Sequence, residues 1–570
     1  MTMTSKQKTS LGESLVEEGI LTAEQLKKAQ GEEKQSGLRL RKVLVRMGLI
    51  AEEDLVAFLS TKLAIPHIEL ENYLIDNPVI DLVPEELARK HELIPVLKIG
   101  NRLTCAMVDP WNVFALDELR LKTGLIIEPA VATETEIRKA LDQYYGAKGT
   151  MEDILKSIDP QKFGGVPKDK DMNVKELQDA VKEPVVIKLV NLIILKAIRE
   201  GASDIHIEPE GESLKLRFRV DGILHEEPSP PKYLQSFLIS RVKILANLDI
   251  AERRIPQDGR FSIKIENREI DIRVSSVPTI HGENVVMRLL DATNAVLKLT
   301  ELGFSKDVYE RYQKLVQRPH GILLVTGPTG SGKTTTLYGS LDKINTVERN
   351  IITVEDPVEY RLTGIRQIQV NPKVNLTFAN GLRSILRQDP DVIMVGEIRD
   401  FETADIATHA ALTGHLVFST LHTNDAAGSV MRLVDLGVEP FLVASSLTGV
   451  LAQRLVRKIC VDCKEAYTPS WEVLKDIGLE ASEKDSKFKF YRGKGCARCL
   501  NSGYKGRIAI FELLVSDEKI RNLIVSKAPL EELKKAARSG GMANLKDDGI
   551  RKIAEGITTI EEVLRVTQED

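Results

Sequence analysis

Residues 327–334 read Gly-Pro-Thr-Gly-Ser-Gly-Lys-Thr, and this loop constrains the fold more than any other feature of the chain. The apolar run from Ile322 to Thr326 predicts a buried strand before it, and residues 335–341 continue as a helix after it. In such a strand–loop–helix unit, backbone N–H groups and the positive helix end converge on phosphates. The fixed positions and both flanks favour a nucleoside triphosphate site over a glycine-rich turn with an unrelated lysine.

The lysine and the threonine that close this loop have separate expected roles. Lys333 reaches the β- and γ-phosphates of a bound nucleotide, and the Thr334 hydroxyl occupies one position on Mg²⁺. The predicted nucleotide-binding residues are Gly327, Pro328, Thr329, Gly330, Ser331, Gly332, Lys333, Thr334 and Thr335.

Further apolar runs at 351–354, 392–395 and 416–419 alternate with helical stretches, which predicts an α/β domain with a mostly parallel sheet. Glu397 follows one of these strands and is expected to polarise the attacking water. Glu355 ends another strand and is the best second carboxylate to help hold Mg²⁺. For both glutamates, the alternative is a solvated strand end.

Two histidines and two arginines lie near these strands. His415 and His422 flank the strand at 416–421 and are expected to sense the γ-phosphate or to support a switch between nucleotide states; a structural role is the alternative. Arg383 and Arg387 are four residues apart, which predicts that they share one helical face.

Four of the five cysteines form two Cys-x-x-Cys pairs, Cys460 with Cys463 and Cys496 with Cys499. Paired thiolates at this spacing suit one tetrahedral Zn²⁺, each pair wrapping the metal from a tight turn. Four reduced thiols without a metal are the alternative.

Composition excludes several classes of protein. With 79 Lys+Arg against 83 Asp+Glu, the formal net charge is -4, which argues against a dedicated nucleic-acid binder. The longest apolar run, Val185 to Ile198, is too short for a bilayer and is interrupted by Lys188. The polar N-terminus lacks the apolar core of a signal peptide. We therefore expect a cytoplasmic protein whose membrane contact is peripheral.

The rest of the chain divides into modules. A repeat at an offset of 29 residues aligns Leu11 with Leu40 and Gly19 with Gly48, and each copy reads as two helices around a glycine turn. Glycine, proline and charge runs at 146–173 indicate a linker. The expected domains are a helical repeat module at 1–65, a small α+β module at 66–147, a flexible linker at 148–174, an α+β domain at 175–298, and a nucleotide-binding domain at 299–570 with a zinc hairpin at 455–512 and C-terminal helices.

These motifs together resemble the ATPase family of type II secretion and type IV pilus systems. Residues 354–359 resemble its aspartate box, 386–400 its variant Walker B segment, and 413–424 its histidine box. The resemblance continues upstream through 202–209, 217–222 and 256–260. It implies a RecA-like P-loop ATPase core behind a PAS-like α+β domain and a helical or mixed N-terminal region. In this family a glycine at 396 is normal, and Arg273 and Arg288 match nucleotide-contacting arginines.

The resemblance also implies function and partners. It points to a homohexameric motor that hydrolyses ATP to power pilin polymerisation, with an inner-membrane platform protein and a cytoplasmic ring protein as partners. The alternatives are a type II secretion ATPase that drives pseudopilus assembly and export, and an ATP-binding docking or regulatory subunit with little turnover. ATP, Mg²⁺ and Zn²⁺ are the implied cofactors.

The N-terminal repeat resembles the cyclic di-GMP-binding module of some pilus and secretion ATPases. It departs from that pattern at Gln30, Glu33 and Lys62. Two interpretations therefore stay open, a cyclic di-GMP site and a docking module for a platform partner.

Overall fold

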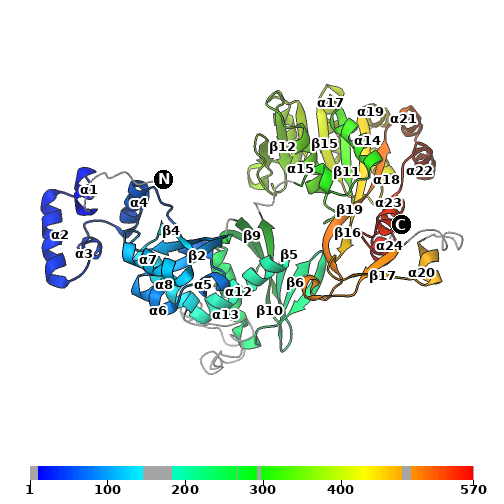
Figure 1. Ribbon diagram of the computed structural model, residues 1–570. Coiled ribbons are helices and arrows are strands. Elements are labelled where there is room, and N and C mark those ends of the chain that lie inside the picture. Colours follow the sequence, from blue (N-terminus) through cyan, green and yellow to red (C-terminus); the bar gives the residue numbers. More distant parts are fainter. Residues whose placement is uncertain (1–10, 146–182, 266–267, 292–296, 478–488, 569–570) are drawn as a thin grey trace. The chain divides into compact units, whose positions relative to one another are not determined.

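The computed structural model describes residues 11–145, 183–265, 268–291, 297–477 and 489–568 (Figure 1). The chain forms two compact units, Met1–Thr293 and Asn294–Asp570. The linker predicted at 148–174 lies outside the described residues. No helix in the described ranges is both long and apolar enough to cross a membrane.

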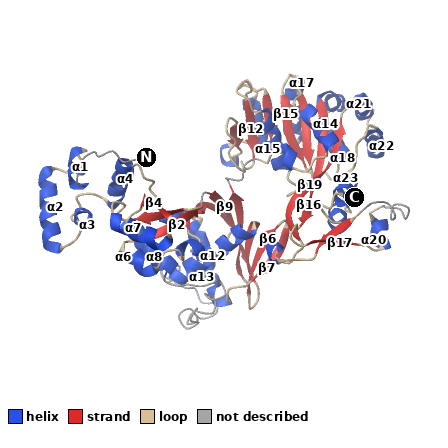
Figure 2. Cartoon of the chain, viewed as in Figure 1, coloured by secondary structure: helices blue, strands red, loops and turns tan. Residues whose placement is uncertain are grey.

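The first unit begins with the predicted repeat, which contains helices only (Figure 2). Thr22 caps the second helix through a capping box, in which its side chain accepts from the Gln25 N–H and Gln25 bonds back to the Thr22 N–H. Gly19 and Gly48 turn the chain with positive φ, 72° and 65°. The repeat is thus confirmed as α1 (Leu11–Glu17), α2 (Ala23–Ser36), α3 (Leu40–Arg46) and α4 (Glu52–Leu63).

A small α+β module follows the repeat. Its sheet has the order β2-β3-β4, with β2 antiparallel and β4 parallel to β3. The module contains both strands and helices, as its α+β prediction requires. The elements are β1 (Tyr73–Leu74), α5 (Asn77–Ile80), α6 (Glu85–Lys90), β2 (Leu93–Ile99), β3 (Arg102–Met107), α7 (Val113–Thr123), β4 (Ile126–Val131) and α8 (Glu134–Tyr145).

The first unit ends in a seven-stranded sheet of order β1-β8-β9-β10-β5-β6-β7. Alternate residues of β9, such as Ile270, Ile272 and Val274, join one hydrophobic core with residues of α12 and α13, so these helices cover one face. The elements are α12 (Pro184–Glu200), β5 (Ala202–Pro209), β6 (Leu214–Val220), β7 (Ile223–Glu227), α13 (Gln235–Leu245), β8 (Gln257–Ile265), β9 (Arg268–Thr279) and β10 (Gly282–Asp291).

The second unit contains the predicted α/β sheet, in the order β13-β12-β14-β15-β11-β16-β19. Every pairing is parallel except β16 with β19. The predicted strands are confirmed within β11 (Gly321–Thr326), β12 (Ile351–Glu355), β14 (Val392–Val395) and β15 (Leu416–Leu421), and the sheet also has β13 (Arg366–Gln369), β16 (Leu447–Ile459) and β19 (Tyr504–Val515).

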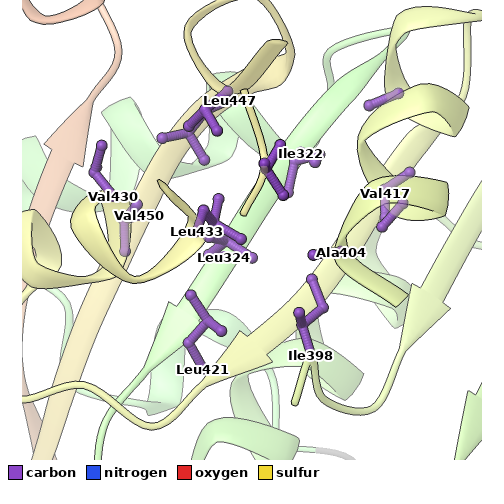
Figure 3. Packing of buried hydrophobic residues seen from close by; sticks show 14 of the residues in the cluster. Ile322, Leu324, Ile398, Ala404, Val417, Leu421, Val430, Leu433, Leu447 and Val450 are labelled. Carbon is purple, nitrogen blue, oxygen red and sulfur yellow. The ribbon is translucent and has the colours of Figure 1, made fainter. Parts of the chain in front are cut away.

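Helices pack on both faces of this sheet, which explains why its central strands are apolar throughout. Ile322 and Leu324 of β11 join one hydrophobic cluster, whereas Leu323 and Val325 join another on the opposite face. Figure 3 shows the first cluster, where these β11 side chains meet those of neighbouring strands and helices. The helices that flank the strands are α14 (Lys306–Val316), α15 (Lys333–Ile344), α16 (Phe378–Ile385), α17 (Phe401–Leu412), α18 (Ala426–Asp435) and α19 (Pro440–Ser446).

One sequence prediction about a helix is wrong. α16 ends at Ile385, so Arg387 lies in the following turn and does not share a helical face with Arg383. Asp389 has a φ of 50° and precedes Pro390. Because a residue before proline is disfavoured in the α-helical region, the helix cannot run on toward β14.

The end of the chain is a hairpin followed by helices. The predicted C-terminal helices are confirmed. The elements are β17 (Lys464–Tyr467), α20 (Trp471–Asp476), β18 (Phe490–Gly493), α21 (Glu518–Val525), α22 (Leu530–Ser539), α23 (Leu545–Ala554) and α24 (Ile560–Thr567).

Candidate nucleotide and metal sites

The order β14-β15-β11 brings three predicted segments to one edge of the sheet. In parallel strands the carboxyl ends lie at the same edge, and ligands of open α/β sheets bind there. Glu397 follows β14, His422 follows β15, and the loop at 327–332 follows β11.

In the phosphate-binding loop, the lysine side chain bonds to backbone carbonyls of the loop itself. Lys333 begins α15, and its Nζ donates to the carbonyls of Gly327 at 2.7 Å and Pro328 at 3.2 Å. Burial lowers the pKa of Lys333 to about 8, although the charge of Glu397 acts in the opposite direction. Thr334 and Thr335 follow in the first turn of α15. The N–H groups and the ammonium of this loop can therefore take a triphosphate.

The side chain of Glu397 is held by an arginine and a histidine. Its side chain is only 14% exposed and forms ion pairs with Arg399 and with His422, whose Nε2 lies 3.3 Å from Oε2. Glu397 is therefore not a solvated strand end. A carboxylate fixed in this way, close enough to Lys333 to influence its pKa, can act on water beside a bound phosphate.

Glu355 is buried and acts as the centre of a hydrogen-bond network. Its carboxylate accepts from the hydroxyls of Tyr338 and Thr353, and from the Gln367 amide at 3.1 Å. Burial, together with the proximity of this carboxylate, raises the pKa of Tyr338 far above its usual range. Glu355 thus ties α15, which begins in the phosphate loop, to β12 and β13.

The two histidines of the β15 segment lie at opposite edges of the sheet. His415 precedes β15, and its backbone carbonyl accepts from the N–H of Gly321 at the start of β11. At about 3.3 Å per residue, β15 separates His415 from His422 by roughly 20 Å. Of these two histidines, His422 therefore lies at the edge that carries the phosphate loop and His415 at the other edge.

Neither arginine of the α16 segment pairs with Glu397. Arg383 pairs with Glu402 at 2.5 Å and is 47% exposed. Arg387, in the turn after α16, donates to the Ser384 hydroxyl at 3.4 Å.

Arg273 and Arg288 belong to the other unit. They are direct cross-strand partners on β9 and β10, and Arg260 of β8 is the opposite neighbour of Arg273. Arg288 also bonds to Asp204 at 3.0 Å. Like charges directly opposite one another repel, and the carboxylate of Asp204 offsets part of this repulsion at Arg288.

The four paired cysteines meet at one point. Their sulfurs all lie within 4.8 Å of one another, with Sγ–Sγ distances of 3.8 Å for Cys460 to Cys496, 3.8 Å for Cys463 to Cys499, and 3.6 Å for Cys496 to Cys499. Tetrahedral zinc with Zn–S bonds of about 2.3 Å requires sulfurs about 3.8 Å apart. Each pair also closes a tight turn, as predicted. The cluster therefore fits one zinc ion with no open ligand position.

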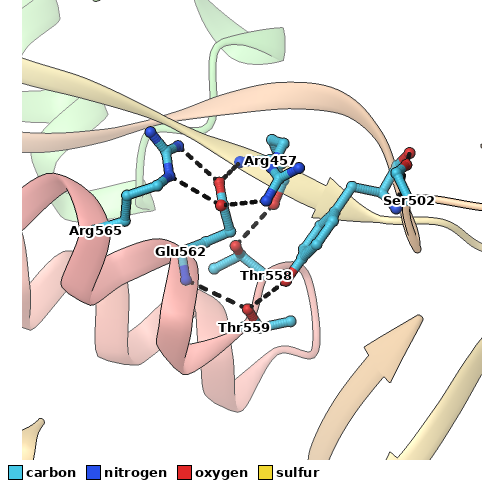
Figure 4. Close-up of polar contacts among 7 residues, drawn as sticks. Arg457, Ser502, Thr558, Thr559, Glu562 and Arg565 are labelled. Carbon is cyan, nitrogen blue, oxygen red and sulfur yellow. Dashed lines mark hydrogen bonds and ion pairs between the residues drawn. The ribbon is translucent and has the colours of Figure 1, made fainter. Parts of the chain in front are cut away.

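An ion-pair network anchors the last helix beside this cluster. Figure 4 shows Glu562 of α24 accepting from Arg457 of β16 and from Arg565. Burial by itself raises the pKa of Glu562, but the two guanidinium groups outweigh it and hold that pKa at about 2. The Arg457 guanidinium also lies 4.0 Å from the ring centre of Tyr504 on β19.

Sequence reasoning missed several residues that hold these sites. Tyr338 reaches Glu355, and Arg399 reaches Glu397. Arg399 lies two residues after Glu397, within the segment 386–400 that the sequence had already singled out. Its position could therefore have suggested that it pairs with Glu397. No sequence pattern marks Tyr338, because it lies on helix α15 and its partner Glu355 lies on strand β12.

Comparison with known proteins agrees with these sites. The family described as Type II/IV secretion system protein matches residues 179–565, and the MshEN domain matches 63–151, the module after the helical repeat. The chain is 47% identical to the type IV pilus assembly ATPase PilB of Myxococcus xanthus, over 98% of this chain and 99% of that protein. It is 44% identical to type II secretion system protein E of Xanthomonas campestris, over 98% and 99%.

A solved structure, the ATPase DotB of Yersinia pseudotuberculosis, shares the fold at 22% identity with a TM-score of 0.50, over 67% of this chain and 94% of that one. Relatives of this identity and coverage show membership of the family and its ATPase activity. The phosphate loop, the Glu397 segment and the cysteine cluster all lie in the second unit, within the matched region. The chain thus belongs to the Type II/IV secretion system protein family and is one of its ATPases.

Proposed function

We propose that this ATPase powers pilin polymerisation in type IV pilus assembly as a homohexamer. ATP binds at residues 327–335, and Glu397 polarises the attacking water. The observation that carries the proposal is the placement of a half-buried Glu397, paired with His422 and Arg399, at the sheet edge that holds Lys333. The similarity to the Myxococcus pilus assembly ATPase over nearly the whole of both chains supports the pilus as the machine.

The proposed cofactors follow from these sites, and the proposed partners follow from membership of the family. Mg²⁺ binds the Thr334 hydroxyl and phosphate oxygens, and Zn²⁺ binds Cys460, Cys463, Cys496 and Cys499. An inner-membrane platform protein and a cytoplasmic ring protein are the proposed partners, and nucleic acid is not one. The protein works in the cytoplasm, peripheral to the inner membrane.

An ATPase assay on the purified protein tests the catalytic assignment. Glu397→Gln keeps the shape of the side chain and removes its basicity, so we expect turnover to fall about 10²- to 10⁴-fold while ATP binding is retained. Lys333→Ala is the control that loses binding. Equal rates for the wild type and Glu397→Gln would contradict the assignment and favour a docking subunit with little turnover.

Type II secretion is the second candidate, because the similarity to the Xanthomonas secretion protein covers almost as much of the chain. Deletion of the gene in its own host separates the two. Loss of surface pili with normal export of folded enzymes supports pilus assembly. Intact pili with enzymes retained in the periplasm support secretion.

The first unit contains a groove that bears on cyclic di-GMP. It has a volume of about 510 Å³ and lies between the helical repeat and α8. Its charged lining residues are the cations Arg41, Lys42, Arg46, Arg138 and Lys139 and the acids Glu52, Glu134 and Asp142. Such a lining suits a phosphate diester, and a docking partner with acidic residues is the other occupant. Calorimetric titration with cyclic di-GMP, with Arg41→Ala as the comparison, distinguishes the two.

A further inference from the structure

Strand β16 extends beyond the strand that leads into the phosphate loop. β16 pairs with β11 as far as Ala452, opposite Thr326, and then continues to Ile459. Gln453 is therefore the first residue past the end of β11, at the point where the chain enters the loop. On its other side Gln453 pairs with Phe511 of β19, so its backbone is fixed.

Gln453 contacts the phosphate loop and the helix behind it at the same time. Its Nε2 donates to the Ser331 carbonyl at 2.7 Å, and its Oε1 accepts from the Thr336 hydroxyl at 2.8 Å. The Gln453 residue is 1% exposed. Its backbone carbonyl lies so close to Gly327 that a Cβ there would come within 2.5 Å, at a φ of 148° that already favours glycine.

The bond from Gln453 to the Ser331 carbonyl also fixes the direction of the Gly332 N–H. The peptide that links Ser331 to Gly332 is planar and trans, so its C=O and N–H point in opposite directions. Because Gln453 holds the carbonyl toward β16, the Gly332 N–H is directed away from β16. A primary amide suits this task, since it offers a donor and an acceptor on one rigid group without a charge.

We propose that Gln453 is a positioning residue of the nucleotide site, which orients the Ser331–Gly332 peptide so that its N–H faces the phosphates. The inference rests on the proposed nucleotide site at residues 327–335. In this role Gln453 acts through the loop, to which its side chain bonds at Ser331. Arg454, the next residue, lies on the opposite face of the strand and donates to the Asn424 carbonyl at 2.9 Å. Of these two neighbours, it is therefore Gln453 whose side chain can orient the loop.

Nucleotide binding and turnover of Gln453→Met test this role. Methionine has a similar length and fills the same space but bonds to neither Ser331 nor Thr336. We expect the Kd for ATP and for ADP to rise about tenfold, since one oriented N–H serves both nucleotides. The rate at saturating ATP stays within about twofold. Unchanged Kd values, or a fall in kcat at unchanged KM, would overturn the proposal.

Gln453→Glu adds a second readout, the pH dependence of the Kd for ATP. A side chain that only occupied space at this position would not produce it. The protonated acid copies the amide, with an O–H toward Ser331 and a carbonyl toward Thr336, whereas the carboxylate has no donor and repels phosphate. The Kd for ATP relative to wild type at the same pH should therefore fall as pH is lowered. A ratio that is independent of pH would overturn the proposal. Gln317→Glu, an exposed change at the end of α14, is the control that binds as wild type does.

Failure of this inference is distinguishable from failure of the proposed nucleotide site. If Lys333→Ala binds ATP as tightly as wild type, the site itself is wrong. If Lys333→Ala loses binding while both Gln453 variants bind normally at every pH, only the positioning role is wrong. Retained zinc and a cooperative thermal unfolding transition confirm that each variant is folded.

Discussion

At the scale of single residues, the nucleotide site depends on charges that are held before any ligand binds. Lys333 bonds to the carbonyls of its own loop, and Glu397 bonds to Arg399 and His422. Groups that are already oriented need little reorganisation when a triphosphate arrives. The ammonium of Lys333 only has to exchange carbonyl oxygens for phosphate oxygens.

The lowered pKa of Lys333 predicts that ATP affinity depends on pH. The free protein loses the Lys333 proton at a pH of about 8, because burial disfavours the ammonium. A bound triphosphate favours the charged form, so binding takes up a proton above that pH. We expect the Kd for ATP to be constant below pH 8 and to rise by up to about tenfold per pH unit above it.

A fluorescent ATP analogue titrated between about pH 6.5 and 9.5 measures this effect. Lys333→Arg stays charged throughout the range, so its Kd should show no such rise. The same Kd at both ends of the range in the wild type would contradict the prediction.

At the scale of elements, β16 connects three parts of the second unit. It pairs with β11 beside the phosphate loop, leads into Cys460 of the cysteine cluster, and carries Arg457, which holds α24. It is paired on both sides as far as Ala452, and beyond that residue it pairs with β19 alone. The cluster and the last helix therefore stabilise the hairpin end of this strand, away from the phosphates.

Replacing one cysteine should remove the metal and leave the nucleotide site intact. We expect about one zinc per chain in the wild type and almost none in Cys460→Ser, because a structural site loses its affinity with one of four thiolates. Protease cleavage should increase within residues 455–512, while ATP binding remains. Elemental analysis measures the zinc, and Cys105→Ser is the control, since Cys105 is buried in the first unit outside the cluster. Wild-type zinc content in Cys460→Ser would rule out this ligand set.

Removing the carboxylate of Glu562 should destabilise the attachment of α24. Glu562→Ala leaves the Arg457 guanidinium, 16% exposed, without its partner, at a cost of about 3–5 kcal/mol. In the wild type the carboxyl pKa is about 2, against 4.5 in the unfolded chain, so its contribution is present above pH 4.5 and is lost as pH falls toward 2.

Thermal unfolding of the full chain as a function of pH measures this contribution. Glu561→Ala, an exposed neighbour on the same helix, should change stability by less than about 0.5 kcal/mol. Equal melting temperatures for Glu562→Ala and Glu561→Ala at pH 7 would show that the network adds nothing.

At the scale of the whole molecule, the charged groups that we propose for catalysis are found in both units. The second unit supplies Lys333 and Glu397, and the first unit carries the row of Arg260, Arg273 and Arg288 on the sheet face opposite α12 and α13. Phosphoryl transfer gains most from cations beside the developing charge. We therefore propose that Arg273 and Arg288 of the first unit contribute to turnover.

Arg273→Ala and Arg288→Ala should each lower kcat about 10²- to 10³-fold and leave the fold unchanged. Arg268→Ala is the matched control, because Arg268 lies on the same strand at an alternate position whose side chain belongs to the opposite face. ATPase rates and circular dichroism of the three variants measure the effect. Wild-type rates for both Arg273→Ala and Arg288→Ala would exclude the first unit from catalysis.

The sequence by itself determined the local parts of this protein. The phosphate loop, the apolar strands before and after it, the helical repeat and the Cys-x-x-Cys pairs are encoded in short runs whose spacing reflects backbone geometry. Such patterns can be interpreted without knowing the tertiary contacts of the segment, and the corresponding elements are confirmed. The family followed from the same runs.

Only the tertiary structure decided which side chains meet. The order β14-β15-β11 brings Glu397 to His422 and leaves His415 at the far edge, although both histidines flank one strand. The length of β16 beyond β11 places Gln453 under the phosphate loop, far along the chain from it. Strand order and register are set by the packing of the two faces of the sheet, which no short segment of the sequence contains.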